Sequence, residues 1–195
     1  MKIKRFISKI LESNGYVIFS GRGGSCYLID PAAKNTKFLD FIEENELQLK
    51  GILLTHDHYD HIAAVKKLVA KTNCPVYIHN SDLPDFRYEA IPFEDGAAFD
   101  LDGETITAVN TPGHTRGSVC YVCPESNCVF TGDTVFVIDL GRTDLPEGSP
   151  QEMKNTIRNI VSRWDDDVVI YPGHGESGTM KRVREINTEY KEALE

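Results

Sequence analysis

The chain has 195 residues, of which 41% are apolar and 26% are charged, a composition typical of an ordinary globular protein. Its 30 acidic and 21 basic side chains give a net charge of −9, and a field of that sign repels phosphate backbones, which argues against a nucleic-acid partner. No run approaches the ~20 apolar residues of a membrane helix, and polar residues interrupt the segment after the basic residues 1–6, so we expect no signal peptide and a cytoplasmic location.

Short apolar runs separated by turn residues predict many strands, with helices between and after them. In chain order, strands are expected at residues 6–11, 16–20, 26–30, 51–54, 76–79, around 99, 105–110, 118–122, 128–131 and 168–171. Helices are expected at residues 35–48, 60–71, 149–164 and 179–194, with Ser149 as the N-cap of the third. We find no repeat or linker, so we expect residues 1–195 to form one domain, with helices outside a sheet sandwich.

The chain contains five cysteines, an odd number that predicts reduced thiols rather than a disulfide framework. Cys120 and Cys123 have the CxxC spacing of some metal and redox sites. They fall along a predicted strand, however, and alternation there places the two side chains on opposite faces. We therefore expect a structural role for them.

Four residues of metal-ligand type lie within six positions directly after the predicted strand 51–54: His56, His58, Asp60 and His61. Imidazole and carboxylate groups suit a borderline divalent metal such as zinc. Two histidines at i and i+2 after a strand can point to the same side, and the next two residues follow as the chain turns into a helix. The segment therefore predicts a metal site.

Three further loops have one form in common, a metal-type residue beside glycine at the end of an apolar strand. They carry His114, Asp133 and His174. Glycine allows the sharp turn that raises the neighbouring side chain towards a shared site. Each loop alone is typical of an ordinary turn, but together with the 56–61 segment they indicate one site with seven ligands.

This pattern, with HxHxDH at residues 56–61, resembles that of the metallo-β-lactamase superfamily from about Ser25 to Gly175. The resemblance implies an αββα sandwich, in which two mixed sheets carry helices on their outer faces and metals at one edge. It also implies that two metal ions are held by the following residues: the first by His56, His58 and His114, the second by Asp60, His61 and His174, with Asp133 bridging both.

Two divalent ions held in this way, zinc above all and otherwise iron or manganese, can keep a bridging hydroxide at neutral pH. The resemblance thus implies hydrolysis of an ester, thioester or amide, with Asp60 and Asp133 as catalytic carboxylates. Thr55, Asp57 and Thr115 are candidates for hydrogen bonds that orient the imidazoles, and simple loop packing is the alternative for each.

The segment Gly141-Arg142-Thr143-Asp144 resembles the small, single-domain glyoxalase-II-like hydrolases, which cleave thioesters such as S-lactoylglutathione. By this resemblance we hypothesise that Arg142 binds a substrate carboxylate, and an internal Arg142–Asp144 ion pair is the alternative. Glu176 stands where glyoxalase II has a tyrosine that contacts the substrate, and a carboxylate there does not favour an acidic tripeptide.

Other reaction classes share the fold. Persulfide dioxygenases have a similar Gly-Arg-Thr-Asp segment and bind one iron, here through His56, His114 and Asp133. Lactonases and other ester hydrolases share the metal pattern, and non-catalytic scaffolds typically lose ligands, none of which is lost here. We expect a thioester hydrolase that acts on a small molecule as a monomer or small homo-oligomer.

Overall fold

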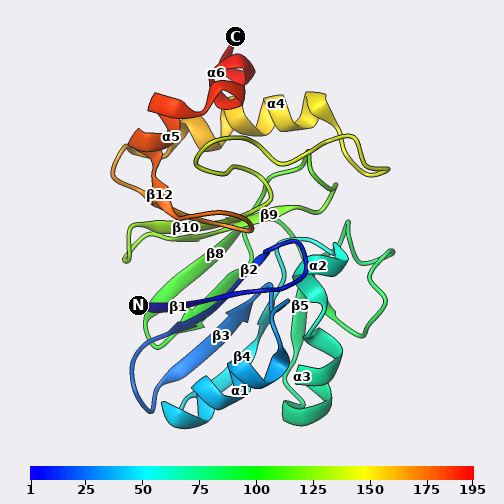
Figure 1. Cartoon of the computed structure of the whole chain (residues 1–195), viewed down its shortest axis with the longest axis vertical. Coiled ribbons are helices and arrows are strands. Elements are labelled where there is room, and N and C mark those ends of the chain that lie inside the picture. Colours follow the sequence, from blue (N-terminus) through cyan, green and yellow to red (C-terminus); the bar gives the residue numbers. More distant parts are fainter.

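The computed structural model describes all 195 residues and contains two six-stranded sheets packed face to face (Figure 1). The strands of the first, sheet A, are β1 Lys2–Ile7, β2 Asn14–Phe19, β3 Ser25–Ile29, β4 Gln48–Leu53, β5 Val76–His79 and β6 Ile91–Phe93, in that spatial order. Those of sheet B are β7 Ala98–Leu101, β8 Glu104–Asn110, β9 Val119–Cys123, β10 Cys128–Gly132, β11 Val169–Pro172 and β12 Gly178–Thr179, also adjacent in chain order. Both sheets are mixed: β3 to β6 pair in parallel, as do β10 and β11, and the other pairs are antiparallel.

Helices cover the outer face of each sheet. They are α1 Asn35–Glu44, α2 Tyr59–Ile62, α3 Val65–Thr72, α4 Pro150–Asn159, α5 Met180–Ile186 and α6 Thr188–Leu194, with a short 3₁₀ turn at Val161–Arg163. Figure 1 shows α1 and α3 on the side of sheet A and α4, α5 and α6 on the side of sheet B. None of these helices combines the length and apolarity that crossing a membrane requires.

Strand alternation divides the core into three layers. In β2, Val17 and Phe19 face α1 and α3, whereas Tyr16 and Ile18 face sheet B. The layer beneath α4 to α6 contains Met153, Ile157, Ile170 and Met180 among its buried residues. The αββα architecture expected from the sequence is therefore confirmed.

Several predicted element bounds were wrong, each for a local reason. Of the strand predicted at 6–11, only Phe6 and Ile7 belong to a strand, at the end of β1, and the chain turns over residues 8–13, where Leu11 and Glu12 have positive φ angles that a strand does not allow. The helix predicted at 35–48 ends at Glu44, since Glu46 also has positive φ and Gln48 already belongs to β4. The short strands β6 and β12 were not predicted.

The other helix predictions were too long. The helix predicted at 60–71 is interrupted between α2 and α3, where the N–H of Ala64 donates to the carbonyl of Pro31 instead of continuing one helix. The helix predicted at 149–164 ends at Asn159, although Ser149 caps it as expected by accepting from the N–H of Glu152. The segment 179–194 is two helices, because Asn187 ends α5 and its side chain caps α6.

The cysteines lie within the buried layers. Cys123 belongs to the layer between the sheets, whereas Cys120, on the other face of β9, lies 3.5 Å from the Thr111 hydroxyl. The prediction that alternation separates these two side chains is thus confirmed. Cys123 is instead the register partner of Cys128 on β10. Burial of all five thiols agrees with a packing role.

Candidate metal centre

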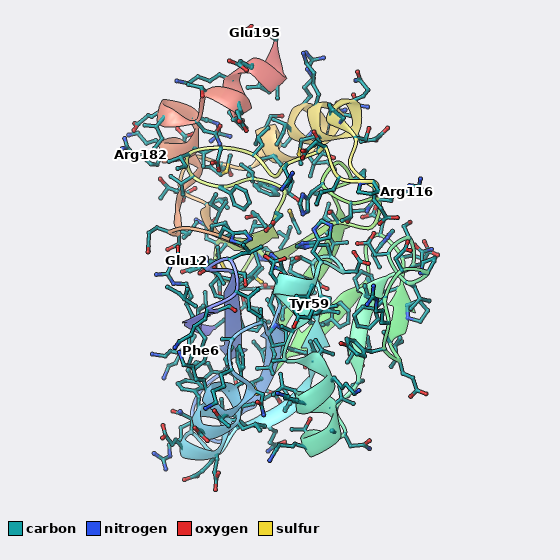
Figure 2. All side chains as sticks on the ribbon, turned by 45° about the vertical axis from the view of Figure 1, so that its right-hand side comes forward. Phe6, Glu12, Tyr59, Arg116, Arg182 and Glu195 are labelled. Atoms are coloured by element: carbon teal, nitrogen blue, oxygen red, sulfur yellow. The ribbon has the colours of Figure 1, made fainter.

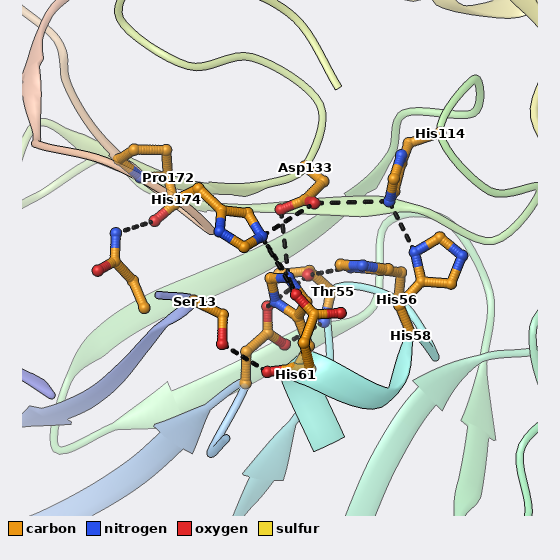
Figure 3. A network of polar contacts seen from close by, with 12 residues as sticks. Ser13, Thr55, His56, His58, His61, His114, Asp133, Pro172 and His174 are labelled. Atoms are coloured by element: carbon orange, nitrogen blue, oxygen red, sulfur yellow. Dashed lines mark hydrogen bonds and ion pairs between the residues drawn. The ribbon is translucent and has the colours of Figure 1, made fainter. Parts of the chain in front are cut away.

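All seven predicted ligands meet at one edge of the sandwich, although they come from both sheets. The loop after β4 and helix α2 supply His56, His58, Asp60 and His61. The loops after β8, β10 and β11 supply His114, Asp133 and His174. In Figure 3 these last three side chains stand opposite the histidines from sheet A.

The side chains of metal-ligand type form three overlapping groups of three, one of which joins Asp30 to His56 and His61. The other two contain only predicted ligands. The atoms of His56, His58 and His114 lie within 4.8 Å of one another, and so do those of Asp60, His61 and His174. These are the two triads that the resemblance implied.

Asp133 lies between the two groups. Its Oδ2 is 3.5 Å from Nε2 of His114 in one group and 3.5 Å from Nε2 of His174 in the other. Its Oδ1 is 3.4 Å from Nε2 of His61. A carboxylate in this position can bridge two cations, as the sequence led us to expect.

Hydrogen bonds fix the tautomers of four of the five histidines. Nδ1 of His114 lies 2.7 Å from the carbonyl of Arg142, and Nδ1 of His174 lies 3.1 Å from the carbonyl of Leu11. A carbonyl only accepts, so each Nδ1 carries a proton and donates it, which leaves Nε2 directed into the site. His61 is held in the same way, since its Nδ1 donates to Asp30 at 3.1 Å.

The tautomer of His56 follows from its neighbour Thr55. The Thr55 hydroxyl donates its one proton to Asp30 at 2.5 Å. It can then only accept from Nδ1 of His56, 2.9 Å away. The lone pair of His56 Nε2 is therefore free to bind a cation.

The chemistry of this donor set fits two cations. His56 Nε2 and Asp133 Oδ1 are buried without any hydrogen-bond partner, and leaving such atoms unsatisfied is costly. His58 Nδ1 lies 2.8 Å from His114 Nε2, so the two ring nitrogens hydrogen-bond to each other without a metal and are close enough to share an ion. Five imidazoles and two carboxylates directed at one space suit divalent metals.

The charges around the site shift its pKa values in opposite directions. Burial, together with the neighbouring imidazoles, lowers the pKa of His56 well below 6.5, and burial and His114 lower that of His58 to about 4. Burial alone would raise the pKa of Asp133, but His61, His174 and His114 outweigh it and hold the pKa at about 2. The imidazoles of His56 and His58 are thus neutral at pH 7, and the Asp133 carboxylate is ionised.

Two buried tyrosines hold the sheets together at this edge. Tyr16 of sheet A donates its hydroxyl to the carbonyl of Pro172 in sheet B at 2.6 Å. Tyr121 of sheet B donates in the opposite direction, to the carbonyl of Leu54 at 2.7 Å. Each acceptor lies two residues before a metal-site histidine, so the cross-sheet bonds set the distance between the two halves of the site.

Asp30, at the end of β3, was not predicted as a site residue. Its buried carboxylate accepts from the N–H and hydroxyl of Thr55 and from Nδ1 of His61. The available signal was a polar residue directly after an apolar strand, but Asp30 precedes proline and lacks the neighbouring glycine that marked the other loops.

Of the three residues predicted to orient the imidazoles, only Thr55 does so. The hydroxyl of Thr115 bonds with Asp82 and Ser118 instead, so its role is loop packing, the alternative interpretation. Asp57 makes no side-chain hydrogen bond to a histidine, and its half-buried carboxyl has a raised pKa because of burial and the nearby Asp85.

The Gly141–Arg142 segment contacts the site through its backbone. A Cβ at Gly141 would collide with the backbone carbonyl of Asp133, so only glycine fits there. The Arg142 carbonyl orients His114, while the exposed guanidinium pairs with Asp144 through two hydrogen bonds of 2.7 and 2.8 Å. The alternative ion pair is therefore formed.

Comparisons with known proteins agree with this geometry. Residues 10–174 match the model of the metallo-beta-lactamase superfamily, and the chain belongs to that superfamily. It is 35% identical over 212 residues to an uncharacterized protein of Mycobacterium leprae, covering 96% of this chain and 97% of that protein. It is 32% identical over 181 residues to the hydroxyacylglutathione hydrolase GloC of Haemophilus influenzae, covering 82% and 84%. The solved structure of TTHA1623 in a di-iron-bound form matches with a TM-score of 0.85 at 29% identity, covering 95% of this chain and 98% of that chain.

Asp30→Asn tests the positioning role of this carboxylate. An asparagine presents one acceptor and one donor where Thr55 and His61 require only acceptors, so His61 loses its orientation. We expect a loss of about 10–100-fold in metal affinity, measured by competition with a chromophoric chelator. Asp40→Asn, which removes the same charge from the exposed surface of α1, is the control. Equal affinities for the two variants would contradict the role.

Metal binding is expected to release protons. Burial would lower the pKa values of His61 and His174, but Asp133, Asp30 and Asp60 raise them to about 9 and about 10. In the metal-free protein both are therefore protonated at pH 7, and a metal must displace the Nε2 protons. Calorimetric titration at pH 7 in buffers of different ionisation enthalpy should show proton release, and apparent affinity should rise with pH up to about 10. An affinity independent of pH between 7 and 9 would refute this expectation.

Proposed function

We propose that this metal-dependent hydrolase of the metallo-β-lactamase superfamily binds two metal ions and cleaves thioesters. The observation that carries the proposal is the position of Asp133 between two complete three-residue groups. One metal would be held by the His56 group and one by the Asp60 group. When bound, the two ions activate a water molecule at neutral pH and polarise the substrate carbonyl.

The residues of the chain then have separate tasks. Asp133 keeps the two groups at a fixed separation, and the Nδ1 hydrogen bonds of the histidines keep their Nε2 atoms directed inwards. Asp60, whose Oδ2 lies 3.3 Å from His174 Nε2, accepts the proton of the attacking water. Water adds to the carbonyl carbon, the carbon–sulfur bond breaks, and the products are a carboxylic acid and a thiol.

A largely apolar pocket adjoins the site and supplies a place for the substrate. It has a volume of about 410 Å³ and is formed by Phe136 to Asp139 and by His174 to Glu176. Its three apolar side chains suit an acyl chain, and the carboxylates of Asp139 and Glu176 disfavour an anionic one. Glu176 is turned towards Arg5, which bonds both its carboxylate and the Gly175 carbonyl at 3.0 Å.

The name of the Haemophilus influenzae relative supports thioester cleavage, since a hydroxyacylglutathione is a thioester. The di-iron form of TTHA1623 supports two metals at such a site. Zinc is the metal we propose, with iron and manganese as alternatives for the same nitrogen and oxygen ligands.

Metal reconstitution combined with a thiol-release assay tests the proposal. Metal-free protein is titrated with zinc, and cleavage of a panel of thioesters and lactones is followed by a thiol reagent and by acid release. We expect thioesterase activity to rise until about two equivalents are bound. Activity complete at one equivalent of iron, with oxygen uptake on glutathione persulfide and no thiol release from thioesters, would instead identify a persulfide dioxygenase. Preference for lactones would identify a lactonase.

We further propose that Arg142 binds a substrate carboxylate, which replaces Asp144 as the partner of the guanidinium, since such surface ion pairs are weak. Arg142→Ala should raise KM for a glutathione thioester about 3–10-fold and leave KM for an uncharged thioester unchanged. Asp144→Ala, which frees the guanidinium, should lower the same KM. An unchanged kcat/KM of Arg142→Ala for the acidic thioester would exclude the binding role.

A further inference from the structure

A second pocket, called the hollow below, lies beside the loop of residues 8–13, on the side away from the metal centre. It has a volume of about 380 Å³ and is formed by Ile7 at the end of β1 and the next three residues, by residues 32–35 and Lys37 around the start of α1, and by Tyr59, Ala63, Ala64 and Lys67 of the α2–α3 segment. Tyr59 is 67% exposed although it is aromatic, and Figure 2 shows it on the surface at α2.

The charges of the hollow are opposite to those of the whole chain. Four lysines line it, Lys9, Lys34, Lys37 and Lys67, and no acidic side chain does, in a protein of net charge −9. None of the four takes part in an ion pair, since every pair outside the histidines is made by arginine or by the chain N-terminus. A concave group of unpaired cations attracts a compact anion.

The start of α1 adds to this positive potential. Lys34 precedes the helix and Asn35 begins it, and both line the hollow. No side chain caps this helix end, and its first turn contains no acidic residue. The ten-residue helix thus directs the positive end of its dipole towards a space already lined by lysines, without a carboxylate to neutralise it.

The hollow and the metal centre share one wall. Residues 8–10 of the loop after β1 line the hollow. Further along the same loop, the Leu11 carbonyl accepts from His174 and the Ser13 hydroxyl donates to the Asp60 carbonyl at 2.5 Å. Tyr59, which lines the hollow, stands in sequence between the candidate ligands His58 and Asp60. Only the loop after β1 therefore separates a ligand in the hollow from the candidate metal centre.

We propose that this lysine hollow binds a phosphate group on the thiol carrier of the substrate, an inference that rests on the proposed thioester hydrolysis. Lysine is a point-charge donor that suits phosphate oxygens, and the apolar parts of Tyr59 and Ile10 contact the organic portion of the carrier. The acyl end occupies the apolar pocket beside His174, and the carrier crosses the 8–13 loop to place its phosphate among the lysines.

Direct binding tests the hollow without requiring catalysis. Adenosine 3′,5′-bisphosphate, which is the part of coenzyme A that contains the adenosine, its 3′-phosphate and one of the two 5′-phosphates, and inorganic phosphate are titrated separately into the metal-loaded protein by calorimetry. Lys37→Ala/Lys67→Ala should weaken binding of the bisphosphate about tenfold. Lys66→Ala/Lys71→Ala removes the same charge from exposed positions of α3 outside the hollow and should leave binding unchanged.

Kinetics identify the source of the phosphate. Acetyl-coenzyme A and the acetyl thioester of N-acetylcysteamine have the same reacting group, and only the first contains phosphate. The Lys37/Lys67 variant should raise KM for the first about tenfold and leave both the second KM and kcat unchanged.

Three outcomes would overturn the proposal. They are the absence of bisphosphate binding to the wild-type protein, an equal effect of the control variant, and loss of inorganic phosphate binding with unchanged KM for acetyl-coenzyme A. If neither thioester is cleaved, the proposed thioesterase activity fails, whereas the binding titration still decides whether the hollow takes phosphate.

Discussion

Two hydrogen bonds between the sheets, from Tyr16 to the Pro172 carbonyl and from Tyr121 to the Leu54 carbonyl, connect the halves of the metal centre. Neither half is sufficient alone, because each proposed metal takes ligands from both sheets. A buried tyrosine hydroxyl needs an acceptor, so these bonds also restrict how the sheets can slide. The distance between the ligand groups is thus determined by the packing of the whole sandwich.

Within each half, the histidines are oriented by acceptors on segments that would otherwise have no connection with the site. Asp30 from the end of β3, the Leu11 carbonyl from the loop after β1 and the Arg142 carbonyl each hold one Nδ1. The Nε2 atoms are thereby preorganised for a cation before it binds, which lowers the cost of assembling the site. The Gly141–Arg142 segment thus acts through its backbone, whatever its side chain contacts.

The loop of residues 8–13 has two faces with different chemistry. One face touches His174 and Asp60, and the other lines the lysine hollow. Since the largely apolar pocket lies next to His174, the proposed thioester places its acyl group there and its charged carrier on the lysine side of the loop. This division gives the proposed thioester a defined orientation.

The sequence alone determined the residue types of the centre, because the spacing of HxHxDH is a local property. Strand alternation predicted a sheet sandwich with helices outside it, and the αββα arrangement was implied by the family resemblance that the HxHxDH pattern carries. It could not reveal Asp30 or the Leu11 and Arg142 carbonyls as histidine partners, since these contacts join segments 28 to 163 residues apart and a backbone carbonyl has no sequence signal. Element ends at Leu11, Glu46 and Ala64 also depended on tertiary hydrogen bonds or backbone angles that propensity does not encode. Only the folded chain decided that four distant lysines share one hollow beside the metal centre, because charge clusters form in space.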